Sequence, residues 1–192
     1  AGETPCLTFS GLSKVHRACG YRAGWMVLSG DPISSGDYHH ALDLLGALRL
    51  CANVPGQWAA LAALTGPDTI CALTSAGGRL YEARRAVIEA CAASSRLSLT
   101  VPQGALYAFP GIDTSDLPAF DDHRFALDLL THEGVLIVPG SSFNVPYHNH
   151  FRVTLLPQPD QIREVFARIE TALERWAGQA HMPAPASLAA GV

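Results

Sequence analysis

The sequence predicts an α/β protein in which a piece of a sheet layer is followed by a smaller α+β lobe. Apolar segments with strand character and Gly- and Ser-containing turns come first, and segments with helical spacing follow them. Beyond residue 97 the pattern changes to short alternating segments between further helices. With 192 residues, of which 48% are apolar and 16% charged, the chain can bury the core of one or two compact units.

The first part of the chain contains two predicted strands and several helices. The strands cover residues 6–9 and 24–28, and the loop between them begins with the turn Ser10-Gly11-Leu12-Ser13. Apolar residues at helical spacing predict helices over 38–50 and 55–64. A longer helical pattern over 67–92 is interrupted at Gly77-Gly78, which predicts two helices or one kinked helix connecting two lobes.

The second part of the chain mixes short strands with helices. Residues 97–101 and 105–109 alternate like two paired strands around the turn Pro102-Gln103-Gly104. A helix over 120–132, strands over 135–138 and 151–156, and an amphipathic helix over 160–176 follow. We therefore divide the chain into a piece of an α/β sheet layer, a small α+β lobe and an Ala- and Pro-rich tail that we expect to be disordered, over residues 1–78, 79–177 and 178–192.

The composition excludes several classes of function. A formal charge of −4 without a Lys/Arg block offers no footprint for nucleic acid or an anionic membrane, so a small molecule is the expected partner. No apolar run approaches the roughly 18 residues of a transmembrane span, and we see no signal peptide. The five cysteines are odd in number and contain no CxxC pair, which argues against a disulfide framework or zinc site and favours a reducing, cytoplasmic setting.

Lysine is almost absent from the chain. Lys and Arg together number 13, and Lys14 is the single lysine, so the other 12 are arginines. A primary amine can lose its proton and condense with a carbonyl group, which a guanidinium cannot do. Lys14 can equally be the last survivor of a general bias toward arginine, and composition alone does not decide between these interpretations.

Lys14 ends the string Ser10-Gly11-Leu12-Ser13-Lys14, and Arg22 follows eight residues after it. Glycine lets the backbone approach an anion, serine hydroxyls donate hydrogen bonds to phosphate oxygens, and an arginine fork can hold a phosphate with two hydrogen bonds. A phosphate held beside an amine is what a pyridoxal phosphate site requires, because the lysine forms a Schiff base and the phosphate anchors the ring. These residues therefore predict pyridoxal 5'-phosphate as the cofactor.

The Ser10–Lys14 string closely resembles the lysine signature of the class I/II aminotransferases, which are pyridoxal phosphate enzymes of fold type I. Four further segments, in the same order, resemble blocks of the bacterial alanine transaminases in this family: Arg49–Pro55, Gly77–Glu82, Gly104–Pro110 and Phe151–Pro157. The resemblance covers almost the whole chain. It implies the C-terminal part of this α/β fold, with the edge of the large pyridoxal-phosphate-binding domain in residues 1–78 and the small domain in 79–177.

The resemblance also implies roles for residues around the predicted cofactor. Lys14 would be the catalytic lysine that forms the Schiff base, Arg22 would bind the cofactor phosphate, and Ser13 would be a second phosphate donor. Relatives often place a serine three residues before the lysine, where this chain has Gly11. Ser10 or Ser13 would therefore make that contact. Arg17 stands where the general signature has a small residue, although the alanine subgroup tolerates arginine there.

Substrate binding is assigned by the same resemblance. Arg152 matches the arginine that grips the substrate α-carboxylate, a planar task that lysine performs poorly. Asn53 and Tyr107 match recurring positions near the site, and we assign Asn53 to substrate binding. His148 and His150 could suggest a metal site, but no third ligand stands at a recognisable spacing, so we expect a solvated loop and no metal.

The activity implied is that of an aminotransferase that moves an amino group from an amino acid, alanine in the closest subgroup, to a 2-oxo acid such as 2-oxoglutarate. It would follow a ping-pong mechanism in a homodimer. Members of the family are much longer than this chain, so we expect a missing N-terminal half and little activity from the chain alone. Two alternatives stay open, namely an aminotransferase-like sensor domain of a transcription regulator and a related lyase or synthase that releases ammonia or another leaving group.

Overall fold

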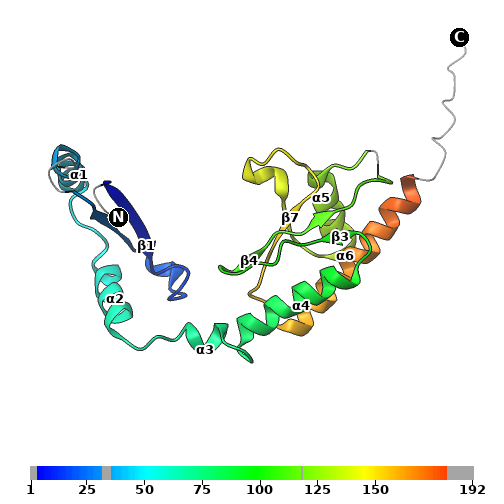
Figure 1. Ribbon diagram of the computed structural model, residues 1–192, viewed down its shortest axis with the longest axis horizontal. Helices are drawn as coiled ribbons and strands as arrows, with labels where there is room; N and C mark the ends of the chain where they lie inside the picture. Colours follow the sequence, from blue (N-terminus) through cyan, green and yellow to red (C-terminus); the bar gives the residue numbers. More distant parts are fainter. Residues whose placement is uncertain (1–3, 32–35, 118, 181–192) are drawn as a thin grey trace, which may run out of the picture. The chain divides into compact units, whose positions relative to one another are not determined.

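A computed structural model describes residues 4–31, 36–117 and 119–180 (Figure 1). The chain separates into two compact units, residues 1–72 and residues 73–192. The division falls within a single helical turn, α3 (Cys71–Thr74). The assignment of the two parts to a large and a small domain stays a prediction.

A hairpin and two helices make up the first unit. Strand β1 (Cys6–Gly11) pairs antiparallel with β2 (Gly24–Ser29), with Cys6 opposite Ser29 and Gly11 opposite Gly24. Helices α1 (Gly36–Arg49) and α2 (Val54–Thr65) follow. Both predicted strands and both predicted helices are confirmed, with ends that differ by one or two residues.

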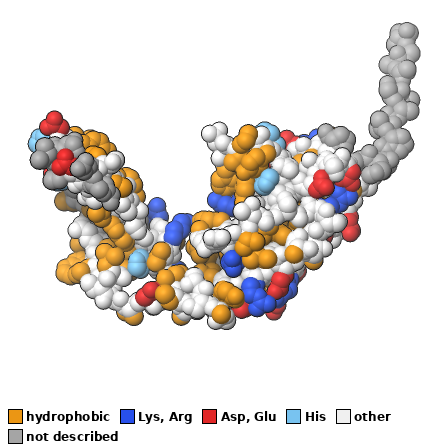
Figure 2. Space-filling model, in the orientation of Figure 1, with side chains coloured by type: hydrophobic (Ala, Val, Ile, Leu, Met, Phe, Trp, Pro, Cys, Tyr) orange, Lys and Arg blue, Asp and Glu red, His pale blue; other side chains and the backbone are white. Residues whose placement is uncertain are grey.

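The first unit buries little of its apolar surface. Of its described residues, only Leu12 and Gly56 are buried. Leu48 on α1 is 81% exposed and Trp58 on α2 is 69% exposed. Figure 2 shows hydrophobic side chains along the helices of this unit. Contiguous apolar surface of this kind is typical of a face that packs against further protein.

The second unit has a hydrophobic core between three helices and short strands. Helices α4 (Arg79–Ala93) and α6 (Pro159–Ala180) lie side by side, and α5 (Asp122–Glu133) packs against α6 (Figure 1). Strands β4 (Tyr107–Ala108), β7 (Phe151–Thr154) and β6 (Val138–Pro139) form one antiparallel sheet in the order β4-β7-β6. The core includes the fully buried residues Val87, Phe125, Leu129, Ile169 and Leu173.

The predicted hairpin between residues 97–101 and 105–109 is wrong. Strand β3 (Leu97–Ser98) pairs instead with β5 (Gly111–Ile112), and β4 pairs with β7. Strands β3, β4 and β5 each have only two residues. Burial of Leu97, Ala108 and Ile112 in the core therefore determines their pairing partners more than the local turn does. As a result, β7 lies at the centre of its sheet and carries Arg152.

Helix α6 continues beyond its predicted end at residue 176. Arg175 binds Asp128 and Glu133 through two guanidinium nitrogens, at 2.8 Å and 2.7 Å, and Trp176 donates a hydrogen bond to Asp128. Burial would raise the pKa of Asp128, but these hydrogen bonds outweigh it and lower the pKa. Residues 178–180 of the predicted tail are therefore helical, and residues 181–192 lie outside the described residues.

Iodoacetamide at about pH 8 is expected to alkylate the exposed Cys6 and Cys51 and to leave Cys91 unmodified. Cys91 lies in the core of the second unit, where burial, assisted by the charge of Glu170, raises the pKa of its thiol to about 11. The thiolate is the reactive form, and at that pKa its share at about pH 8 is on the order of one in a thousand. Peptide mass mapping with and without denaturant measures the difference. Rapid labelling of Cys91 in the folded chain would contradict its place in the core.

Candidate active site

The β1–β2 hairpin brings the predicted amine and phosphate ligands to one loop. The last strand pair is Gly11 opposite Gly24, so residues 12–23 form a single connection that carries Lys14 near its start and Arg22 near its end. A Cβ at Gly24 would lie 2.8 Å from the carbonyl oxygen of Ser10, and one at Gly11 would lie 3.0 Å from that of Ala23. Only glycine therefore lets the two strands close this tightly at the base of the loop.

Backbone hydrogen bonds and one buried side chain hold the loop in shape. The amide of Leu12 donates to Ala23 at 3.1 Å, and the amide of Ala18 donates to the carbonyl of Leu12 at 3.0 Å. The Leu12 side chain is fully buried between these contacts. Ser10, Lys14 and Arg22 are exposed and Ser13 is partly exposed, so the polar side chains of the predicted site face outward from an ordered loop.

Two arginines of the loop have left-handed backbone conformations. Arg17 has φ 55° and Arg22 has φ 50°, a region that side chains other than glycine, asparagine and aspartate seldom adopt. Arg22 ends the short 3₁₀ helix η1 (Cys19–Tyr21), and its Nη1 donates to the carbonyl of Cys19 at 2.8 Å. Arg17 donates to Thr69 Oγ1 at 2.7 Å. The Arg22 guanidinium thus uses one N–H group within the loop, and its other N–H groups have the geometry to bind an anion.

Asn53 connects helix α2 to this loop. Its Oδ1 accepts a hydrogen bond from the amide of Gly56 at 3.2 Å, which caps the N-terminus of α2. Its Nδ2 donates to the carbonyl of Tyr21, the residue before Arg22, at 2.5 Å. Gly56 is buried against the same segment. The residue assigned to substrate binding therefore also holds the loop, while its amide keeps one more N–H and one more lone pair.

Replacing Gly56 by alanine is expected to loosen the contact between α2 and the loop. The added Cβ would lie 2.8 Å from the Cβ of Ala23 and 3.1 Å from the carbonyl oxygen of Tyr21. Overpacking of this kind costs about 1–3 kcal/mol, so amide hydrogen exchange in residues 19–23 should become faster. The control is Gly46→Ala in α1, because no described atom lies within 4 Å of that Cβ. Equal exchange rates in Gly56→Ala and the unaltered protein would contradict the packing role.

Arg152 lies in the second unit, on β7, between two aromatic rings. Its guanidinium carbon lies 4.8 Å from the centroid of the Tyr107 ring and 5.0 Å from that of Phe143. Its Nε is buried without a hydrogen-bond partner among the described residues. Attraction to the rings holds the cation in place without using a carboxylate, which keeps the positive charge available to an anionic ligand.

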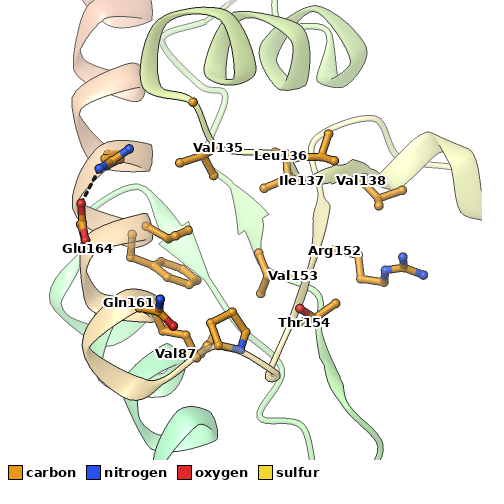
Figure 3. A pocket seen from close by; sticks show the side chains of 16 residues that line it. Val87, Val135, Leu136, Ile137, Val138, Arg152, Val153, Thr154, Gln161 and Glu164 are labelled. Carbon is orange, nitrogen blue, oxygen red and sulfur yellow. Dashed lines mark hydrogen bonds and ion pairs between the residues drawn. The ribbon is translucent and has the colours of Figure 1, made fainter. Parts of the chain in front are cut away.

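A hollow of about 480 Å³ lies beside β7. Its lining is largely apolar and includes Val87, Val135, Ile137 and Val153. Arg152 also lines the hollow, and Figure 3 shows its side chain pointing away from that of the apolar lining residue Val153, as expected for neighbours that alternate along a strand. The predicted residues Lys14, Arg22 and Asn53 do not line this hollow.

The expectation of a solvated loop at His148 and His150 is wrong for His150. Its ring stacks on Phe109 with centroids 5.2 Å apart and lies 4.2 Å from the ring of Tyr147. Burial lowers the pKa of His150, which favours the neutral imidazole. In the parts of the chain that the structure covers, three or more His, Cys, Asp or Glu side chains nowhere gather closely enough to hold a metal ion.

Comparison with protein families matches residues 1–169 to the family described as "Aminotransferase class I and II". The chain belongs to this family. The expected fold class is thereby confirmed, because solved aminotransferases also share the structure. One aminotransferase from Escherichia coli superposes with a TM-score of 0.84 at 40% identity, over 94% of this chain and 44% of that one. Alanine aminotransferase from Pyrococcus furiosus gives a TM-score of 0.80 at 36% identity, over 90% of this chain and 43% of that one.

Curated relatives of this class I/II chain include a glutamate-pyruvate aminotransferase and an alanine aminotransferase. This chain is 44% identical over 156 residues to the glutamate-pyruvate aminotransferase AlaA of Escherichia coli K12, and the matched region covers 81% of this chain and 38% of the relative. It is 41% identical over 170 residues to the alanine aminotransferase of Mycobacterium tuberculosis H37Rv, which covers 88% of this chain and 39% of the relative. The chain thus spans about two fifths of the length of these relatives. Within its described ranges, no helix has the length and apolar character to cross a membrane.

Three contacts of the candidate residues could not be predicted from the sequence. The hydrogen bond from Asn53 to Tyr21 and the contact of Tyr107 with Arg152 join residues that are distant along the chain. The third contact, of the Phe143 ring with Arg152, joins the turn before β7 to the strand itself. The Asn53-Val54-Pro55 sequence gave a usable signal for a helix cap, because Asn at the N-cap and Pro in the first turn are favoured there. No comparable signal marked Phe143.

Proposed function

We propose that this chain is part of a pyridoxal-phosphate-dependent aminotransferase that moves an amino group from an amino acid, alanine being the best candidate, to a 2-oxo acid such as 2-oxoglutarate. The observation that carries the proposal is the single hairpin loop that holds both Lys14 and Arg22, in a chain that belongs to the class I and II aminotransferases. The names of the curated relatives support alanine as the amino donor or product.

The donor chemistry of the loop suits pyridoxal phosphate. Arg22 and the hydroxyls of Ser10 and Ser13 offer N–H and O–H donors to a phosphate, and Lys14 offers a primary amine on the same loop. The close approach of the strands at Gly11 and Gly24 holds these groups on one short connection. When bound, the cofactor supplies an electrophilic aldehyde and a conjugated ring that accepts electrons from the substrate Cα.

In this proposal each residue has a separate task. Lys14 takes the proton from the substrate Cα as a general base and releases it to a different carbon as a general acid, because return to Cα would undo the step. Arg152 holds the substrate α-carboxylate with its planar fork, and the two rings beside it fix the plane of that fork. Asn53 contributes its remaining amide N–H or lone pair to the bound substrate. Two substrates that use the same residues in turn give ping-pong kinetics.

The proposal includes a further part of the protein. Apolar side chains exposed on α1 and α2, such as Leu48 and Trp58, support an additional segment that packs on the first unit. The lengths of the relatives support the same conclusion, and we propose that this segment is the N-terminal half of a homodimeric, cytoplasmic enzyme. The segment would complete the cofactor site, so the chain alone should have little activity.

Steady-state assays of the full-length protein loaded with pyridoxal phosphate test the proposal. With L-alanine and 2-oxoglutarate, we expect pyruvate and glutamate in equal amounts and parallel lines in double-reciprocal plots. Release of ammonia without formation of a new amino acid would contradict the proposal and would indicate a lyase instead. Binding of cofactor and amino acid without turnover, together with a DNA-binding segment in the remaining sequence, would contradict it in favour of a sensor.

A further inference from the structure

Asp122 is a buried carboxylate to which the proposed site gives no task. It is the first residue of α5, it is 3% exposed, and no other charged residue in the described ranges is buried. Both of its oxygens accept hydrogen bonds from Ser141, Oδ2 from the backbone amide at 2.8 Å and Oδ1 from the hydroxyl at 2.9 Å. The N-terminus of α5 adds a favourable dipole. A buried charge is retained only where such partners compensate for the lost water.

Ser141 belongs to the 3₁₀ turn η2 (Gly140–Phe143), which Asp122 thereby attaches to α5. At its other side, the amide of Gly140 donates to the carbonyl of His150 at 2.7 Å, and a Cβ at Gly140 would collide with that same oxygen. The turn is therefore held between α5 and the chain just before β7. Its last residue is Phe143, whose ring faces the guanidinium of Arg152.

The guanidinium of Arg152 depends on this turn for its orientation. Its Nε is buried and has no hydrogen-bond partner in the described part of the chain, so no carboxylate fixes its plane. The rings of Tyr107 and Phe143 are its close neighbours, and Tyr107 comes from the adjacent strand β4. Movement of η2 would shift one of the two rings.

We infer that the Asp122–Ser141 pair is a positioning device for Arg152. Asp122 holds η2, η2 holds the Phe143 ring, and the ring fixes the plane in which the Arg152 fork meets a carboxylate. The inference deepens the proposed function, because the α-carboxylate of the amino acid is the proposed ligand of Arg152. Asp122 is a positioning residue, since it acts on the ligand only through these intermediates.

The substitution Asp122→Asn tests the pair with little change in volume. An amide has one acceptor oxygen, so its NH₂ group can pair with Ser141 Oγ only if that hydroxyl turns to accept, and the two charge-assisted hydrogen bonds are replaced by weaker neutral ones. The matched control is Asp121→Asn, one residue earlier. Asp121 caps α5 through the amide of Arg124 at 2.8 Å, and asparagine caps a helix as well as aspartate does.

Two measurements on the full-length protein decide the question. The first is the Arg152 Nε–H resonance in ¹⁵N NMR, assigned by its loss in Arg152→Lys, which the neighbouring rings should shift and burial should protect from exchange. The second is the KM for L-alanine together with the dissociation constant of pyridoxal phosphate. We expect Asp122→Asn to move the resonance and raise KM about tenfold, with the cofactor constant unchanged. Asp121→Asn and Ser141→Thr, which keeps the hydroxyl, should resemble the unaltered protein.

An unmoved resonance and an unchanged KM in folded Asp122→Asn would overturn the inference. Parallel losses of kcat, cofactor affinity and thermal stability, without the shift in the Arg152 signal, would overturn it in favour of a merely structural role. The NMR comparison needs no turnover, so it separates this inference from the proposed function. If the unaltered protein transfers no amino group, the proposed function fails, and the resonance alone decides whether Asp122 positions Arg152.

Discussion

Replacement of Lys14 by arginine is expected to abolish transamination by the full-length protein. The variant keeps a positive charge on the loop, but a guanidinium stays protonated, so it neither condenses with an aldehyde nor takes a proton from the substrate Cα. Proton transfer by a positioned side chain contributes about 10²- to 10⁴-fold, so kcat should fall by at least about 10³-fold. A coupled assay for pyruvate formed from L-alanine measures the loss.

The loop should survive this substitution, which makes the result interpretable. Backbone hydrogen bonds hold the loop near Lys14, including the one in which the carbonyl of Lys14 accepts from the amide of Arg17 at 3.1 Å. Circular dichroism checks that the fold is unchanged. Arg163→Lys on the exposed face of α6 provides the control, because it exchanges the same two residue types at a residue with no proposed task and should retain kcat. Retained transamination in Lys14→Arg would exclude the proposed role.

The sequence predicts the surroundings of Lys14 better than those of Arg152, for a physical reason. Lys14 and Arg22 lie on one hairpin, and a hairpin is determined by residues close together in the chain, here the Gly11 and Gly24 pair that closes its base. The same kind of local reasoning failed at residues 97–109, where strands of two residues find partners through burial in the core. Short strands carry too little pattern to specify a register.

Around Arg152 the information lies in contacts between distant segments. Tyr107 reaches the guanidinium because β4 pairs with β7, and Phe143 reaches it because Asp122 holds η2. Neither pairing has a sequence signature of its own. The resemblance to a family could therefore name Arg152 and Tyr107, but it could not show that aromatic rings orient the cation.

Replacement of Arg152 by lysine is expected to raise the KM for L-alanine about 10- to 100-fold while leaving the affinity for pyridoxal phosphate unchanged. An ammonium group keeps the charge, but it cannot make two parallel hydrogen bonds to a carboxylate or lie flat between the rings of Tyr107 and Phe143. Loss of a hydrogen bond to a charged group costs about 1.5–3 kcal/mol, which corresponds to this range of KM. Initial rates over a range of alanine concentrations provide the measurement.

Arg175→Lys is the matched control for Arg152→Lys, because it replaces a guanidinium that has no proposed contact with the substrate. Arg175 is also partly buried in the second unit and binds two carboxylates, those of Asp128 and Glu133, but it joins α6 to α5. Replacing Arg175 by lysine should lower the thermal stability and leave the KM for L-alanine unchanged. Arg152→Lys should raise that KM and leave the thermal stability unchanged, because Arg152 has no ion pair in the described residues to lose. A KM for L-alanine that is the same in both variants would mean that Arg152 does not bind the substrate carboxylate.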